Sequence, residues 1–163
     1  EVADRVVLMN KGQVEQVGTP ESVYASPATS FVYSFLGSVN LFHGRAAANG
    51  IDTPHGLVQP PSAQGLPVGD SVKAFARPHE IEIDTNIVNS QEGVQAKVTR
   101  VLTFGLNSRV ELDSLPNQPE QHFEVEITVQ EAQALNLQAG QVVTLRPKAL
   151  RVFSEPKPTQ AVV

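Results

Sequence analysis

Two stretches of the chain repeat one pattern, in which a short strand, an Arg-Pro pair and a second short strand follow each other. The first copy covers residues 68–83 and contains Arg77-Pro78, and the second covers residues 139–152 and contains Arg146-Pro147. Proline fixes φ and removes a backbone donor, so the chain is expected to leave a sheet at each pair and to re-enter with alternating apolar residues. Two related half-domains, each closing a small β-barrel, would explain the repetition.

The composition indicates the same fold class. Twelve Pro and eleven Gly accompany seven Phe, two Tyr and no Trp, which is typical of many short strands joined by turns. From Phe123 to Val129 apolar side chains alternate with Glu124 and Glu126, so one face of this strand should be buried. A mainly β fold of antiparallel strands follows, with one short helix expected at Gln130–Leu135.

The first 37 residues begin with a predicted β-hairpin. Strand-like runs at Arg5–Asn10 and Gln13–Val17 flank Lys11-Gly12, and Asn10 and Gly12 are the residues expected to take the positive φ of the turn.

Two short helices are predicted after this hairpin. Thr19 before Pro20 indicates a helix that runs to about Ala25, and Ser26-Pro27 repeats the signal before a second helix that Gly37 ends. An apolar stripe on the second helix should pack against a core. The stripe consists of Phe31, Val32, Phe35 and Leu36.

A domain boundary is expected at residues 37–40, because the helical period disappears from Leu41 onward. Two segments rich in Pro, Gln and Ser, Pro60–Pro67 and Ser114–Gln121, are predicted to be exposed connections. The tail after Glu155 is expected to be frayed.

The charge balance and the chain's ends limit the possible partners. Twelve basic and seventeen acidic residues give a net charge of −5, which argues against a nucleic-acid partner. No apolar run approaches the ~20 residues that span a bilayer, so a soluble chain is expected. Because the chain starts without Met or a signal-type core, it is expected to be cut from a larger protein.

No catalytic or metal-binding motif is found. The chain contains no Cys, no Gly-rich phosphate loop, no His-Glu-x-x-His and no Gly-x-Ser-x-Gly. Its four histidines are scattered and are predicted to be exposed turn residues rather than metal ligands. They are His43, His55, His79 and His122.

Positive side chains gather at the two Arg-Pro corners. They are Arg77, His79, Arg146 and Lys148. Together with exposed backbone N–H groups they could hold a small oxyanion of the sulfate or molybdate type. The favoured interpretation is that the arginines bond to carbonyl groups and brace the corners, and the anion site remains a hypothesis.

A family resemblance starts at the first residue. The stretch Glu1–Pro20 closely resembles the end of an ABC transporter ATPase domain, where this hairpin follows the switch-histidine loop. The next stretch, Pro27–Gly37, looks like the helix that joins this domain to the regulatory extension of importers. The remainder, with Phe75–Glu80 and Leu145–Pro147, resembles the transport-associated OB-like (TOBE) extension.

Two stretches of the sequence look most like the sulfate/thiosulfate branch of this family. They are the junction Gly37–Gly44 and the ending Leu135–Phe153. It implies an ATPase-domain tail at 1–37, a regulatory domain of two small OB-like antiparallel β-barrel lobes at 38–155, and a flexible tail at 156–163. No position would inherit an ATP-contacting role, so the fragment is expected to be non-catalytic, without cofactor or metal.

The full-length protein, by the same resemblance, would use ATP and Mg²⁺ to drive sulfate or thiosulfate uptake. It would be a cytoplasmic homodimer, joined through the regulatory domain and bound to the inner face of the bacterial plasma membrane. Two permease subunits and an extracytoplasmic binding protein would be its partners. Alternatives are the same domain of a maltose/sugar or iron importer, an oxyanion-sensing module, and an OB-type nucleic-acid module, which the charge and few aromatics disfavour.

Overall fold

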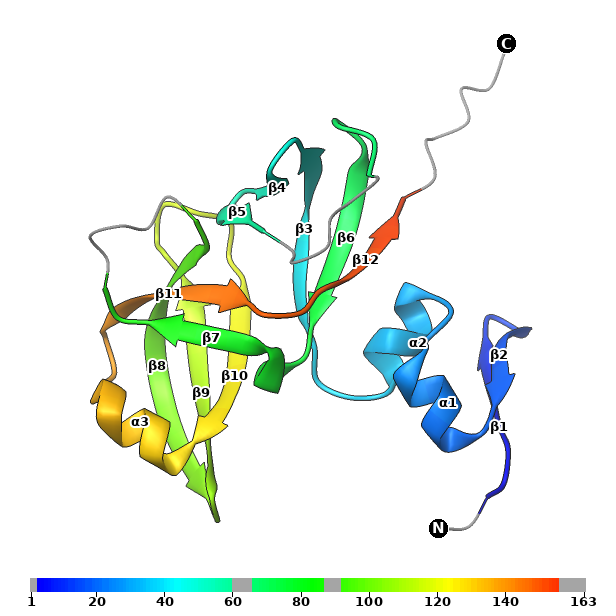
Figure 1. Ribbon diagram of the computed structural model, residues 1–163, viewed down its shortest axis with the longest axis horizontal. Coiled ribbons are helices and arrows are strands. Elements are labelled where there is room, and N and C mark those ends of the chain that lie inside the picture. Colours follow the sequence, from blue (N-terminus) through cyan, green and yellow to red (C-terminus); the bar gives the residue numbers. More distant parts are fainter. Residues whose placement is uncertain (1–2, 60–65, 87–91, 156–163) are drawn as a thin grey trace. The chain divides into compact units, whose positions relative to one another are not determined.

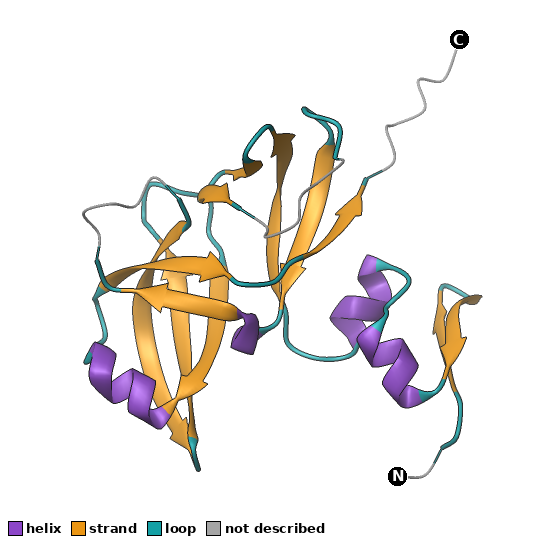
Figure 2. Ribbon diagram, viewed as in Figure 1, coloured by secondary structure: helices purple, strands orange, loops and turns teal. Residues whose placement is uncertain are grey.

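The computed structural model describes residues 3–59, 66–86 and 92–155. The chain divides between Val39 and Asn40 into two compact units. Strands make up most of the second unit (Figure 2). Within the described residues, every helix is too short to cross a membrane.

The first unit consists of a hairpin and two helices. Its elements are β1 (Val6–Asn10), β2 (Gln13–Gly18), α1 (Pro20–Ala25) and α2 (Ser30–Phe35). The hairpin is confirmed, but its turn places Lys11 at φ 49° and Gly12 at φ 79°, so the expectation of positive φ at Asn10 is wrong. A two-residue turn of this kind needs positive φ at both central residues, and these are Lys11 and Gly12.

The two helices start at threonine caps. Thr19 Oγ1 accepts from the Ser22 N–H at 3.1 Å, and α1 has the predicted bounds. The second helix starts later than Ser26-Pro27 indicated, with Thr29 as its cap. The reason is a contact distant in sequence: the side chain of Gln16 donates to the Ser26 carbonyl and accepts from the Ala28 N–H, which holds these residues outside the helix.

The core of the first unit is small. Its buried side chains are Leu8, Val23 and Val32. Phe31 and Leu36 pack beside them, but Phe35 is 65% exposed, so the expected burial of the whole apolar stripe is wrong at that position. The ring of Phe35 stacks on Phe31 with centroids 5.8 Å apart.

The second unit contains two antiparallel five-stranded sheets. The first half supplies β3 (Asn40–Ala47), β4 (Gly50–Thr53), β5 (Gly56–Val58), β6 (Ser71–Ala76), the 3₁₀ turn η1 (Pro78–Glu80) and β7 (Ile81–Asp84). The second half supplies β8 (Val94–Phe104), β9 (Asn107–Ser114), β10 (His122–Thr128), α3 (Val129–Leu135), β11 (Val142–Pro147) and β12 (Arg151–Ser154). The sheet orders are β10-β9-β8-β11-β7 and β12-β6-β3-β4-β5 (Figure 1), and one core contains buried residues from both.

The predicted fold class, mainly β with antiparallel sheets, is confirmed, but the ladders among the described residues close neither sheet into the expected barrel. The two copies of the repeat combine in an unexpected way, because each copy contributes one strand to each sheet. Strand β6 pairs with β12, and β7 pairs with β11. The ladders among the described residues leave β10 and β7 as edges of one sheet, in contact but without a ladder between them.

The two prolines of the repeat behave differently. Pro78 leaves its sheet as predicted and starts η1, whereas Pro147 remains inside β11, opposite Ile81. The Lys148 N–H donates to the Glu80 carbonyl at 2.7 Å. In an antiparallel ladder, hydrogen-bonded pairs alternate with non-hydrogen-bonded pairs. Since Lys148 bonds to Glu80, the next pair, Pro147 and Ile81, is a non-hydrogen-bonded pair. The missing N–H of Pro147 therefore costs no hydrogen bond to β7.

Other local expectations are confirmed in the second unit. Phe123 and Val125 alternate inward along β10. Thr128 and Glu131 start α3 with a reciprocal capping box, and the helix covers the expected segment. The predicted connection at 114–121 joins β9 to β10, while residues 60–65 and the tail after Glu155 lie outside the described residues.

One buried hydroxyl in β11 gives a testable prediction. Thr144 is fully buried, and its Oγ1 has no hydrogen-bond partner among the described residues. Replacing the hydroxyl with a methyl group removes an unsatisfied polar atom and keeps the shape. Thr144→Val is therefore expected to raise the free energy of unfolding in urea by about 1 kcal/mol.

Thr53→Val is the matched control for this prediction. Thr53 Oγ1 donates to the Gly56 carbonyl at 2.7 Å and accepts from the His55 N–H at 3.2 Å, so its loss should destabilise the chain. If both variants lost stability to a similar degree, the hydroxyl of Thr144 would have a partner after all.

Candidate functional site

The first Arg-Pro corner is braced by a carboxylate. Arg77 is buried, its N–H donates to Glu80 Oε2 at 2.8 Å, and its carbonyl accepts from the Glu80 N–H at 2.9 Å. The Glu80 carbonyl in turn accepts from Lys148, so the first corner is bonded to the second. Glu80 therefore stabilises both corners.

The second corner contains an ion pair. Arg146 donates to the carboxylate of Asp84 across the β7–β11 ladder. The backbone N–H of Asn86 and then the Arg146 guanidinium hold the pKa of Asp84 below its ordinary value. The charge of Arg146 is thus already partly balanced within the chain.

The four predicted site residues lie near one another but do not share one cavity. His79 and Lys148 line an open groove of about 450 Å³ beside β7, β10 and α3. Arg146 and Lys148 line a smaller recess of about 230 Å³. Arg77 lines neither of them. Carboxylates accompany the cations, with Glu82 in both cavities and Glu92 in the smaller one.

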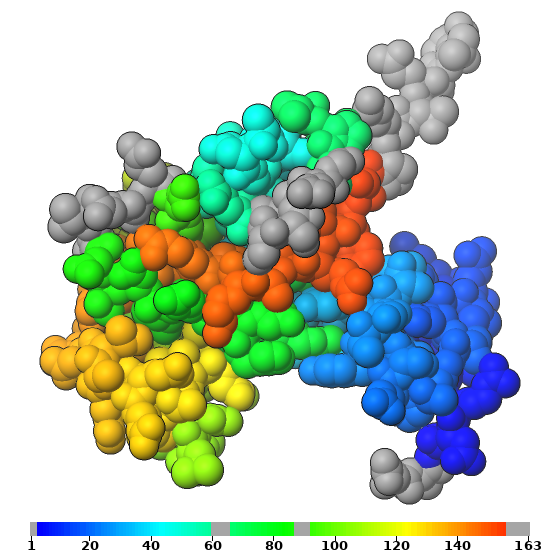
Figure 3. Space-filling model, in the orientation of Figure 1, coloured from blue at the N-terminus to red at the C-terminus, as the bar shows by residue number. Residues whose placement is uncertain are grey.

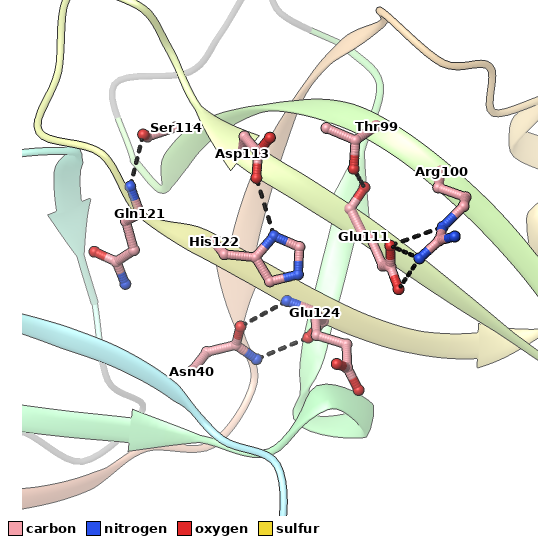
Figure 4. A network of polar contacts seen from close by, with 9 residues as sticks. All are labelled: Asn40, Thr99, Arg100, Glu111, Asp113, Ser114, Gln121, His122 and Glu124. Carbon is pink, nitrogen blue, oxygen red and sulfur yellow. Dashed lines mark hydrogen bonds and ion pairs between the residues drawn. The ribbon is translucent and has the colours of Figure 1, made fainter.

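Paired polar side chains cover the outer face of β8, β9 and β10. Arg100 pairs with Glu111 at 2.8 Å, and His122 Nδ1 lies 2.9 Å from Asp113 Oδ1 (Figure 4). At the edge of this sheet the Asn40 side chain donates to the Glu124 carbonyl and accepts from its N–H, both at 2.8 Å. Arg100, His122 and Asp113 are more than half exposed, so each of these two ion pairs contributes little to stability.

A second polar cluster fastens the end of β12. The Glu155 carboxylate accepts from Ser71 Oγ at 2.5 Å, lies 3.0 Å from His43 Nε2 and pairs with Lys73 at 3.1 Å. A serine nucleophile would pass its proton to histidine, with the carboxylate on the other ring nitrogen. Here one carboxylate oxygen faces both Ser71 and His43 Nε2, so the cluster is a structural clamp.

The clamp predicts a pH dependence. Hydrogen bonds from Ser71, then His43 and Lys73, lower the pKa of Glu155 from 4.5 to about 2. Since the folded-state pKa is depressed, the stabilisation is fully present above pH 4.5 and is lost as the pH falls toward about 2. The free energy of unfolding of Glu155→Gln, measured between pH 2 and 7, should fall below the wild-type value above pH 4.5 and converge with it near pH 2.

The exposed residue Glu21 supplies the control for this prediction. Its side chain lies on α1, outside the Glu155 clamp, and Glu21→Gln should leave the pH profile of stability unchanged. A gap between wild type and Glu155→Gln that stays constant down to pH 2 would contradict the role given to the clamp.

The histidines are only partly as expected. His43, His79 and His122 are exposed, but His55 is buried, and the prediction of an exposed turn residue is wrong there. His55 Nε2 bonds to the Pro119 carbonyl at 2.8 Å, and its ring meets the Phe123 ring edge-on. Among the described residues, no three His, Asp or Glu side chains converge in a way that could hold a metal ion.

The groove beside α3 and the Glu155 clamp were not anticipated from the sequence. Both combine residues from distant strands, such as Ser71 with Glu155, and no short motif marks them. The capping box at Thr128 and Glu131 was the available signal for the helix that lines the groove.

The second unit is similar to a known domain family. Residues 88–148, which include strands β8 to β11, match the TOBE-like domain family. Along nearly its whole length the chain is similar to proteins named sulfate/thiosulfate import ATP-binding protein CysA. The one from Ralstonia nicotianae is 42% identical over 160 residues, and CysA 1 of Chromobacterium violaceum is 44% identical over 154 residues.

These alignments cover 95% and 94% of this chain, but only 42% of each relative. The Bacillus cereus protein of the same name is 39% identical over 153 residues, with 94% of this chain and 42% of the relative covered. The resemblance to sulfate/thiosulfate importer subunits is therefore confirmed, and the chain spans about two fifths of their length.

Similar proteins are also found among the solved structures. The cytoplasmic molybdate-binding protein ModG with molybdate bound gives a TM-score of 0.49 at 19% identity, covering 69% of this chain and 94% of that one.

Proposed function

We propose that this chain is the carboxyl-terminal part of an ABC importer ATP-binding subunit for sulfate or thiosulfate. In this proposal residues 1–37 end the ATPase domain, and residues 38–155 form a non-catalytic regulatory and dimerisation domain. The observation that carries the proposal is the 39–44% identity to the three CysA proteins named above, along 94–95% of this chain.

An exposed apolar face on the hairpin supports the assignment of residues 1–37 to a larger domain. The register pairs Val7 with Val17 and Met9 with Val14. All four side chains are 44–57% exposed. A hairpin with an apolar outer face is marginal in water, so the face needs further chain to cover it.

The remaining parts of the proposal concern the full-length protein. It would bind ATP and Mg²⁺ through residues that precede this chain, work as a homodimer, and contact two permease subunits at the cytoplasmic face of the membrane. An extracytoplasmic binding protein would deliver the anion. The chain by itself would not hydrolyse ATP.

A chimera tests the proposal. This chain would replace the matching segment of the Ralstonia relative, in a strain that lacks its own sulfate importer ATP-binding subunit. Restored uptake of labelled sulfate, with the intact relative and a relative without the segment as controls, is expected. A chimera that folds and hydrolyses ATP but imports no sulfate would reject the proposal and favour a sugar or iron importer.

An oxyanion sensor at the corners is the second candidate, since Arg146 and Lys148 line one recess. Glu82 and Glu92 line the same recess, and their charges oppose an anion. Titration calorimetry of the chain with millimolar sulfate or molybdate is therefore expected to show no binding. Heat that disappears in Arg146→Gln and Arg77→Ala would favour the sensor instead.

A further inference from the structure

The groove beside α3 is formed by elements that are distant in the sequence. One part of its lining comes from η1 and β7, and another comes from β9, β10 and α3. In Figure 3 the green surface of β7 adjoins the yellow surface of β10 and α3. Apart from Lys148, each lining residue lies on a helix or strand, so the groove is preformed, and its volume of about 450 Å³ is typical of small-molecule sites.

Apolar side chains of the core form part of this lining. Ile81 and Ile83 on β7 are 1% and 5% exposed, and Ile127 and Leu135 pack against the same core. Within the described ranges β7 and β10 form no ladder with each other, and residues of both strands line the groove. The apolar part of a ligand would therefore contact the hydrophobic core between two unpaired strand edges.

Three carboxylates line the same groove, one each from β7, β10 and α3. They are Glu82, Glu126 and Glu131. Glu126 accepts from the Asn107 amide at 3.3 Å, and Glu131 accepts from the Thr128 N–H at 2.9 Å, and both donors are neutral. Within the described part of the chain, none of the three carboxylates forms an ion pair. Each of them is therefore available to a cation from outside the chain.

The cations near the groove do not balance these carboxylates. Arg146 is opposite Glu82 in the β7–β11 ladder but forms its ion pair with Asp84. Lys148 supplies one positive charge to the lining, with His79 neutral at pH 7. The lining thus has more negative than positive charge, and a cleft with low-dielectric walls concentrates the field of such charges. A cation is attracted to this groove, and an anion is repelled.

We propose that the groove beside α3 binds a small organic cation, in which an ammonium or guanidinium group is attached to an apolar body. The apolar body would pack on Ile81, Ile83 and Ile127, and the cationic group would donate to the carboxylates that line the groove. This ligand class is opposite in charge to the oxyanion considered for the Arg-Pro corners. The inference goes beyond the proposed importer function and does not depend on it.

Two matched probes test the charge preference of the groove. Phenethylammonium at millimolar concentration would be titrated into the isotope-labelled chain, with the amide signals followed by NMR. Signals from β7, β10 and α3 should move until they saturate. Phenylpropanoate has the same ring and two-carbon chain but ends in a carboxylate, and it should bind about tenfold more weakly or worse. Added salt should weaken the binding of phenethylammonium, because salt screens the attraction.

Charge-removing variants locate the binding. The double variant Glu82→Gln/Glu126→Gln keeps the shapes of both side chains, and it should bind phenethylammonium about tenfold more weakly than wild type. Glu120→Gln is the control, because it makes the same change at an exposed residue that does not line the groove. It should bind the probe as wild type does.

A third variant occupies the groove with a cation of the chain itself. Ala134 is exposed on α3 and lines the groove, so Ala134→Arg places a guanidinium beside the carboxylates without disturbing the core. This variant should show no saturable binding of phenethylammonium, with circular dichroism showing that it is folded. Saturable binding at the wild-type affinity would place the probe outside the groove and overturn the proposal.

The other contrary outcomes are equally specific. Equal binding of phenethylammonium and phenylpropanoate would show a general apolar site and overturn the preference for a cation. Unchanged binding by the double glutamine variant would overturn the role of the carboxylates. A wild-type chain whose signals do not move at millimolar phenethylammonium overturns the site itself. None of these results alters sulfate uptake by the chimera, so failure of the importer assignment is detected independently.

Discussion

Gly56→Ala is expected to destabilise the chain by about 3 kcal/mol or more. Gly56 has φ 140°, and a Cβ at this position would lie 2.3 Å from the backbone carbonyl oxygen of Gly93. The Gly93 N–H donates to the Leu57 carbonyl at 2.7 Å, so the two sheets approach here through backbone alone. No side-chain movement can relieve such a clash.

Gly69→Ala is the control, because it measures the effect of backbone strain without a steric clash. Gly69 also has a positive φ, 92°, but beyond its chain neighbours no atom lies within 4 Å of the position that a Cβ would take. Only the strain of a left-handed residue remains, about 1–2 kcal/mol. Urea unfolding of both variants measures the difference, and equal losses would mean that the sheets do not meet at Gly56.

Phe123→Ala should cost about 3–5 kcal/mol. Phe123 is 1% exposed on β10, and its ring stacks on Phe42 of β3 with centroids 6.0 Å apart. The rings of His55 and Phe123 form a T-shaped pair with centroids 5.8 Å apart. One side chain thus joins both sheets, and its removal leaves a cavity that neither sheet can close.

Phe35→Ala is the control for this truncation, because Phe35 is 65% exposed. Its loss should change stability by no more than about 0.5 kcal/mol. Thermal unfolding followed by circular dichroism compares the two variants. A Phe123→Ala protein as stable as Phe35→Ala would show that the two sheets are held together elsewhere.

The elements predicted correctly are those with local causes. Alternating Phe123 and Val125 indicated β10, and Thr19 before Pro20 indicated α1. The start of α2 was wrong because Gln16, ten residues earlier, bonds to the segment that Ser26 begins. Sequence signals for a cap cannot show that a distant side chain already holds the backbone.

The arrangement around the candidate site depended on pairings that no local pattern contains. The repeat indicated two related copies, but not that β6 would pair with β12 and β7 with β11. This exchange bonds Lys148 to Glu80, and Arg77 does not line the recess that Arg146 and Lys148 share. The sequence showed that four cations lie at the corners. It did not show that carboxylates from other parts of the chain would lie beside them.

The exchange of strands between the copies also determines when the second unit can form during synthesis. Strand β3 begins a sheet that is complete only when β12 pairs with β6, and the ladder joins Phe75 to Arg151. Pairings this distant in sequence form slowly. This sheet can therefore close only after the ribosome has synthesised residues up to Ser154, and a nascent chain that stops before Arg151 has an unpaired edge on β6.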